Sequence, residues 1–248
     1  MFGRLWAALG FLTILPLPTW CRQTEADLPR CVPLFPLIGL GIGGVAGGVI
    51  LLTQAYLPPL LAAVIYLLLL IVVHGGLHLD GLADTGDGFF SHRKRERILE
   101  IMQDARLGAY GCVTLMAVLS LKLAGVLSLT PQMLAKAFFL APLCGRCAMV
   151  VMLVVLPSAR ETGMGALFKQ GRSAWEVIWS LAVLVVAGWC LLQWTGLIAV
   201  GAVLGVAILF MGLCQRKIGG FTGDTLGALS ELSEMTALVT LALLFFRG

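Results

Sequence analysis

The chain of 248 residues carries 12% charged residues and has a mean hydropathy of +0.98, whereas a soluble domain carries roughly 25% charged residues. This deficit excludes an ordinary soluble globular protein and predicts that lipid surrounds most of the chain. The net charge is +4, but the basic residues lie in short segments between apolar runs, which indicates membrane topology rather than binding to nucleic acid.

Residues 2–15 form a modest apolar stretch with one arginine, which predicts a short helix at or in the membrane interface. No convincing signal-peptide cleavage site follows it. The rest of the chain contains runs of about 20 mostly apolar residues, the length that a helix needs to cross a bilayer. Seven runs qualify, at 32–56, 58–78, 107–129, 132–156, 175–194, 196–214 and 226–246.

Basic residues alternate from loop to loop. They occur before the first run and after the second, fourth and sixth runs, and they are absent after the first, third and fifth. Because basic loops stay in the cytoplasm, the N-terminus and these loops are expected there, with the C-terminus outside. Arg247, at the outer end, departs from the pattern. The basic residues that define the pattern are Arg4, Arg22, Arg30, Arg93, Lys94, Arg95, Arg97, Arg106, Arg160, Lys169, Arg172, Arg216 and Lys217.

We therefore expect residues 1–248 to form a single all-α membrane domain, a polytopic helix bundle. Its expected parts are an interfacial segment at 1–31, a cytoplasmic acidic motif with an amphipathic helix at 79–106, and cytoplasmic loops at 157–174 and 215–225.

Two patterns inside the apolar runs are interpreted as packing. The glycines at 39, 41, 43, 44, 47 and 48 resemble a nucleotide-binding loop, but no strand precedes them, and small residues let membrane helices approach closely. Cys144 and Cys147 form a C-x-x-C pair in an apolar run. Cysteine in such a setting is typically a small apolar residue rather than a redox or zinc ligand.

Three aspartates follow the second run within eight residues, in D-G-L-A-D-T-G-D. Asp80, Asp84 and Asp87 are spaced i, i+4 and i+7, which on a helix places them within about 60° of one another. Carboxylates so close repel one another unless a cation lies among them, and their oxygens suit Mg²⁺ or Mn²⁺. The alternative is a solvated acidic helix start, but the small residues between the acids leave room for a bulky ligand.

Further polar residues are expected near these aspartates. Residues 93–111 predict an amphipathic helix that ends at Asp104, a fourth candidate metal ligand, and Arg106, a candidate phosphate ligand. His78 is close enough in sequence to bind metal or phosphate. Arg146, midway along an apolar run, is either functional or part of a structural ion pair. The start of the last run predicts an anion-binding backbone or simple capping by an aspartate, with candidate residues Gly219, Gly220, Thr222, Gly223, Asp224 and Thr225.

The stretches GGLHLDGLADTGDG (75–88), LEIMQDARLGAYG (99–111) and GGFTGDTLGA (219–228) closely resemble the cobalamin synthase family. The resemblance covers nearly the whole chain. It implies an adenosylcobinamide-GDP ribazoletransferase of the bacterial inner membrane, acting in the final steps of vitamin B12 synthesis. Such an enzyme transfers the adenosylcobinamide phosphate group from adenosylcobinamide-GDP to alpha-ribazole or its 5′-phosphate and releases GMP.

This activity suggests roles for the candidate residues. Asp80, Asp84, Asp87 and Asp104 are expected to bind Mg²⁺, with Mn²⁺ as a substitute, and Asp87 or Asp104 to accept the proton of the attacking hydroxyl. The other candidates would bind phosphate. The two substrates and membrane lipid are the expected partners, and a homo-oligomer is left open.

Two other functions are alternatives. The family resembles CDP-alcohol phosphotransferases distantly, and their motif D-G-x-x-A-R is matched at residues 80–83 but not at Asp84, so a phospholipid-forming enzyme is one alternative. The other is a transporter, which is less favoured because most acids lie at loop boundaries rather than near the membrane midplane.

Overall fold

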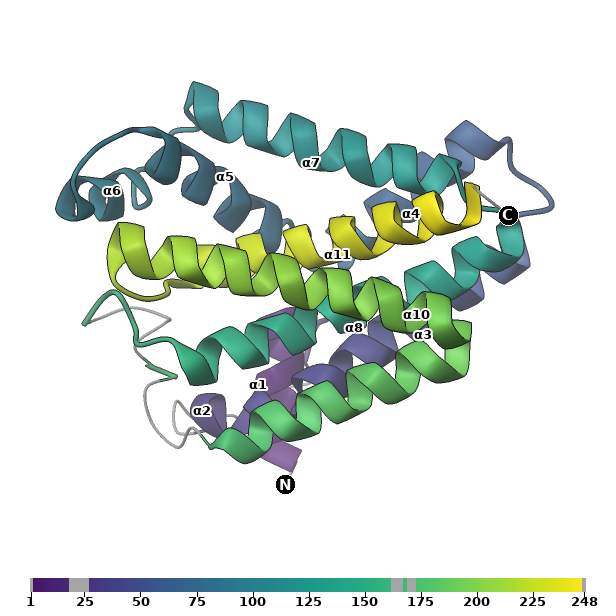
Figure 1. Cartoon of the computed structure of the whole chain (residues 1–248), viewed down its shortest axis with the longest axis horizontal. Helices are drawn as coiled ribbons and strands as arrows, with labels where there is room; N and C mark the ends of the chain where they lie inside the picture. The colour runs from purple at the N-terminus through teal and green to yellow at the C-terminus, as the bar shows by residue number, and fades with distance from the viewer. Residues whose placement is uncertain (1, 18–26, 162–166, 169–172, 247–248) are drawn as a thin grey trace.

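The computed structural model describes residues 2–17, 27–161, 167–168 and 173–246 and is an all-α bundle (Figure 1). Five helices within these ranges are long and apolar enough to cross a membrane, or six if the bent pair α4–α5 counts as one span. The predicted all-α polytopic membrane bundle is confirmed, while the number of seven spans stays a prediction. The helices are α1 (Phe2–Leu12), α2 (Leu28–Cys31), η2 (Val32–Leu34), α3 (Phe35–Thr53), α4 (Pro59–Val73), α5 (Leu77–Phe90), α6 (Arg95–Ile101), α7 (Ala109–Leu127), α8 (Pro131–Val155), α10 (Ala174–Ile218) and α11 (Gly223–Phe246).

The second apolar run is broken, so the predicted single helix at 58–78 is wrong. α4 ends at Val73, α5 begins at Leu77, and the two helices meet at 90°. Gly75 and Gly76 between them have φ angles of 61° and 75°, a left-handed conformation that glycine adopts without steric penalty. The glycine pair therefore ends the apolar helix and redirects the acidic one.

The predicted amphipathic helix at 93–111 is shorter than expected. α6 ends at Ile101, and a new helix, α7, begins at Ala109. Ile98 and Met102 are nevertheless buried, as expected for the apolar face of an amphipathic segment. The residues between these two helices therefore form a loop, and this loop carries Asp104.

The long helix α10 reverses direction at Gln193, whose φ of 51° and ψ of −128° are not helical. Figure 1 shows its two halves running in opposite directions. A Cβ atom on Gly196 would lie 2.0 Å from the Gly188 carbonyl oxygen, so glycine is needed where the halves meet. This break lies beside the predicted boundary between the runs at 175–194 and 196–214.

The core of the bundle surrounds α8, which is buried along most of its length. α3 crosses α8 in direct contact, because a Cβ atom on Gly43 would lie only 2.2 Å from the Phe139 carbonyl oxygen. Gly41 lies on another face of α3, where an added Cβ atom would meet nothing within 4 Å. The packing interpretation of this glycine run is therefore confirmed where the run faces α8. Cys144 and Cys147 are buried in α8 as free thiols.

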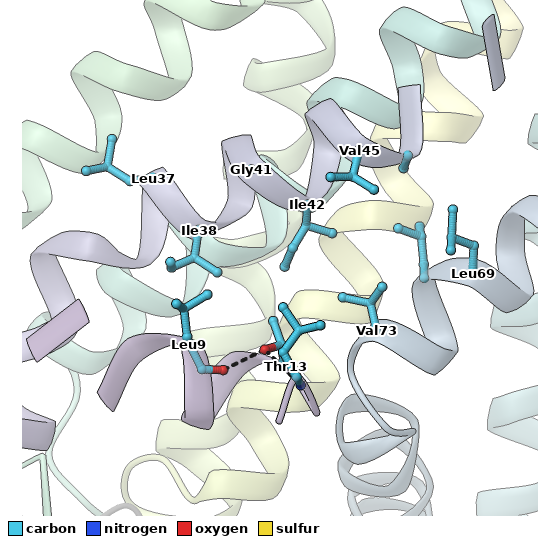
Figure 2. A pocket seen from close by; sticks show the side chains of 12 residues that line it. Leu9, Thr13, Leu37, Ile38, Gly41, Ile42, Val45, Leu69 and Val73 are labelled. Carbon is cyan, nitrogen blue, oxygen red and sulfur yellow. Dashed lines mark hydrogen bonds between the residues drawn. The ribbon is translucent and has the colours of Figure 1, made fainter. Parts of the chain in front are cut away.

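An apolar cavity of about 320 Å³ lies between α1, α3 and α4 (Figure 2). Aliphatic side chains such as Leu9, Ile38 and Val73 line it, and the hydroxyl of Thr13 donates to the Leu9 carbonyl at 2.7 Å. The lining residues include no charged group. This cavity therefore suits lipid or apolar contacts, and a site for phosphate chemistry must lie elsewhere.

Three loops that are distant in sequence meet at one end of the bundle. Arg95 donates from Nε to the Ile218 carbonyl at 2.7 Å and from Nη2 to the Ala159 carbonyl at 3.0 Å. Lys217 donates to the Phe89 carbonyl at 2.7 Å. The basic loops after α5, α8 and α10 thus lie on the same side, in agreement with the charge pattern. Three residues of that pattern, Arg22, Lys169 and Arg172, lie outside the described residues, as does Arg247, which departs from it.

The α3–α8 contact yields a prediction. A Gly43→Ala substitution is expected to destabilise the protein by about 1–3 kcal/mol, because the added methyl group collides with the α8 backbone. Gly41→Ala is the matched control in the same helix and is expected to be neutral or to stabilise by up to about 1 kcal/mol through helix propensity. Unfolding in detergent measures both, and equal stability of the two variants would contradict the described packing.

Candidate functional site

The acidic helix α5 crosses the start of α11 at very short range. A Cβ atom on Gly81 would lie 2.6 Å from the Asp224 carbonyl oxygen, and one on Gly227 would lie 3.1 Å from the Cα atom of His78. The two helices can therefore cross this closely only because residue 81 is glycine. The crossing brings Asp224 close to α5, where Asp84 lies within electrostatic range of both Asp80 and Asp224. Asp224, expected to bind phosphate, thus joins the carboxylate cluster.

Asp80, Asp84 and Asp104 line one cavity of about 320 Å³. Asp80 is exposed, and the other two are half-buried. Their carboxylates line an open space rather than a closed cage. Mg²⁺ is commonly held by one or two carboxylates together with substrate phosphates rather than by a complete protein cage. This cavity therefore offers the ligand chemistry of a site for a metal bound together with a diphosphate.

Asp87 holds the start of α7. Its carboxylate oxygens accept hydrogen bonds from the backbone N–H groups of Gly108 at 2.7 Å and Gly111 at 2.8 Å. A Cβ atom at either glycine would lie within 2.4 Å of the carboxylate. Asp87 therefore caps the start of α7. This role was not predicted from the sequence, although Gly108 and Gly111 at the start of that helix were a signal for it.

Asp104 is paired with Arg106 in the loop between α6 and α7. Arg106 donates from Nη2 at 2.6 Å to one carboxylate oxygen and from Nε at 2.9 Å to the other. These hydrogen bonds lower the pKa of Asp104 to about 2. The Arg106 side chain is 88% exposed, so it is free to turn toward a ligand in the cavity.

The glycine- and threonine-rich turn shapes the junction of α10 and α11. Thr222 and Thr225 cap α11 reciprocally, each hydroxyl accepting from the other residue's backbone N–H, at 3.2 and 2.8 Å. Gly219, with a φ of 74°, ends α10. A Cβ atom on Gly220 would lie 2.1 Å from the Pro157 carbonyl oxygen. These residues therefore orient Asp224, at the beginning of α11 after Gly223, rather than forming an open anion-binding loop.

Arg146 lies in a buried ionic network, away from the cavity. Its guanidinium donates to Glu234 and contacts Nε2 of His74. Lys122 donates to Glu231 at 2.6 Å and to Glu234 at 2.8 Å. The two cations balance the two carboxylates, which a low-dielectric interior requires. The geometry supports the structural ion pair that was the alternative for Arg146. Sequence reasoning missed Lys122, a lone lysine in the run at 107–129.

His78 lies beside this network, with its ring centroid 4.8 Å from that of His74. Its two ring nitrogens are buried and have no hydrogen-bond partner among the described residues. Ligand atoms of His74, His78 and Glu231 come within 4.8 Å of one another. Because Lys122 and Arg146 already neutralise the glutamates, a divalent ion here would add an uncompensated charge to the core. We therefore assign this group to packing.

The fold and the acidic cavity define a polytopic membrane protein with carboxylates gathered where α5, the loop after α6 and the start of α11 come together. The family model described as Cobalamin-5-phosphate synthase matches residues 4–242, and the chain belongs to this family.

Similar proteins carry the name adenosylcobinamide-GDP ribazoletransferase. The chain is 38% identical to that of Geotalea daltonii over 97% of both chains. It is 40% identical to that of Roseiflexus sp., over 98% of this chain and 90% of the relative. It is also 40% identical to that of Desulforamulus reducens, over 94% of each. No solved structure matches the chain, so the distant likeness to CDP-alcohol phosphotransferases stays a prediction.

The buried network yields a second prediction. Lys122→Met leaves an unpaired buried carboxylate and is expected to destabilise the protein by about 3–5 kcal/mol. The double variant Lys122→Met/Glu231→Gln removes one charge of each sign and is expected to recover more than half of that loss. Chemical unfolding in detergent measures both, and a double variant less stable than the single one would contradict the charge balance.

The cap of α7 yields a third prediction. Asp87→Ala is expected to destabilise the protein by about 1 kcal/mol, within the 0.5–2 kcal/mol that the loss of a helix cap costs. Asp80→Asn, on the exposed face of the same helix, is expected to change stability by less than about 0.5 kcal/mol. Thermal unfolding compares them, and an Asp87→Ala protein as stable as wild type would show that the two hydrogen bonds do not hold α7.

Proposed function

We propose that the protein transfers the adenosylcobinamide phosphate group from adenosylcobinamide-GDP to alpha-ribazole or its 5′-phosphate. The products are adenosylcobalamin or its 5′-phosphate, and GMP. The observation that carries this proposal is the crossing of α5 and α11, which gathers Asp80, Asp84 and Asp224 at one end of the bundle. The family and the names of its relatives agree with it.

Asp80, Asp84 and Asp224 would hold a Mg²⁺ ion, with Mn²⁺ as a substitute, because hard carboxylate oxygens are the ligands that these ions prefer. Crowded carboxylates at a half-open cavity also favour a cation electrostatically. When bound, the metal supplies positive charge that neutralises the diphosphate.

The residues around the cavity have separate tasks in the proposed reaction. A ribose hydroxyl of ribazole forms a new bond to the phosphorus on the corrinoid side, while the bond from that phosphorus to the oxygen of GMP breaks. Asp104 lines the cavity and takes the proton of the hydroxyl once Arg106 turns from it to a phosphate oxygen. Asp87 positions α7 instead, because both of its oxygens accept backbone hydrogen bonds.

The proposed location is the bacterial inner membrane, with the N-terminus and the active site facing the cytoplasm. Two observations support it. The basic loops meet at one end of the bundle, and basic loops stay in the cytoplasm. The acidic cavity is lined by the loop that follows α6 at that same end.

GMP release from adenosylcobinamide-GDP and alpha-ribazole tests the function. The purified protein is expected to release GMP with Mg²⁺ and to stop when EDTA is added. Asp84→Asn is expected to lower the rate roughly 100-fold, as the loss of a direct electrostatic contact does. Glu100→Gln, an exposed acid paired with Arg97, is the control and should keep the wild-type rate. Turnover of CDP-diacylglycerol instead would support the phospholipid-forming alternative, and full activity in EDTA would remove the metal from the scheme.

A further inference from the structure

Arg160 is carried to the acidic site by a firmly held segment. Residues 157–159 pair with Phe221 in a parallel bridge, in which the Ala159 N–H donates to the Phe221 carbonyl at 2.8 Å and the Phe221 N–H to the Pro157 carbonyl at 2.9 Å. Arg95 binds the Ala159 carbonyl at 3.0 Å. The backbone next to Arg160 is thus tied to the turn that begins α11.

The guanidinium of Arg160 lies against the carboxylate cluster. Its Nη1 is 3.3 Å from the Oδ2 atom of Asp224, and its Nη2 donates to the Leu99 carbonyl at 3.2 Å. It is within electrostatic range of Asp84. Its Nε is a buried donor with no hydrogen-bond partner among the described residues, so part of its hydrogen-bonding capacity is unused.

Several other basic side chains make different contacts. Arg95 and Lys217 donate to backbone carbonyls, and Arg146 is enclosed with Glu234. Arg106 pairs with Asp104 in an exposed loop. Arg160 therefore differs from these residues in touching the carboxylate of Asp224 at the start of α11, with a side chain that is 21% exposed.

We propose that Arg160 binds a phosphate oxygen of the diphosphate in the GDP-activated donor. This inference rests on the proposed function and assigns to it a substrate-binding residue. An arginine remains charged and presents a planar fork of N–H donors that matches two phosphate oxygens. Placed beside Asp224, the fork contacts the phosphates directly while the carboxylates hold the metal.

Steady-state kinetics of Arg160→Gln, Arg160→Lys and Arg216→Gln test this role. Arg160→Gln is expected to raise the KM for adenosylcobinamide-GDP roughly tenfold or more, the size of a lost charge-assisted hydrogen bond. The KM for alpha-ribazole, which has no phosphate, should not change. Arg160→Lys should recover part of the loss, because it keeps the charge but not the fork. Arg216, exposed on α10, is the control for a lost positive charge.

An unchanged donor KM in Arg160→Gln or Arg160→Lys overturns the inference, and so does an equal rise of both KM values, which indicates a structural role. Failure of the wild-type protein to release GMP would refute the proposed function instead. In that event calorimetric titration with GDP still tests Arg160. Weaker GDP binding by Arg160→Lys than by wild type supports the inference, and equal binding overturns it.

Discussion

The site depends on one backbone contact, the crossing of α5 over the first turn of α11 at Gly81. A side chain there would occupy the space of the Asp224 carbonyl, so the two helices would separate. Separation would part the carboxylates that come from the two helices. α5 contributes Asp80 and Asp84 and α11 contributes Asp224, so these three carboxylates form one cluster only where the two helices touch.

A second constraint acts deeper in the bundle. Lipid offers no water to solvate a charge, and the interior nevertheless contains Lys122, Arg146, Glu231 and Glu234. Their pairing makes the group neutral and joins α7, α8 and α11 through side chains that cannot part without exposing a bare charge. This network and the glycine crossing both lie on α11. α11 is therefore held by ion pairs along its middle and by close backbone packing against α5 at its start.

Much of the fold could be predicted from the sequence, because apolar runs of spanning length leave little choice of structure. Runs such as 132–156 and 226–246 match α8 and α11 closely. The bend after α4 was not predicted, because hydropathy carries no information on backbone dihedral angles. The bend depends on the left-handed φ angles of Gly75 and Gly76. At the site, the stripe of Asp80 and Asp84 was visible as a spacing on one helix. The addition of Asp224, the capping by Asp87 and the enclosure of Arg146 depend on which helices touch, and this is a property of tertiary structure.

The hydrogen bond from Arg95 to Ile218 joins residues that are 123 positions apart. The ribosome synthesises α5 long before it synthesises α11 and the turn that precedes it. Because synthesis proceeds from the N-terminus, α5 is present in the nascent protein before α11, the helix against which it packs. The carboxylate cluster that α5 and α11 form together is thus completed only late in translation, after α11 has been made.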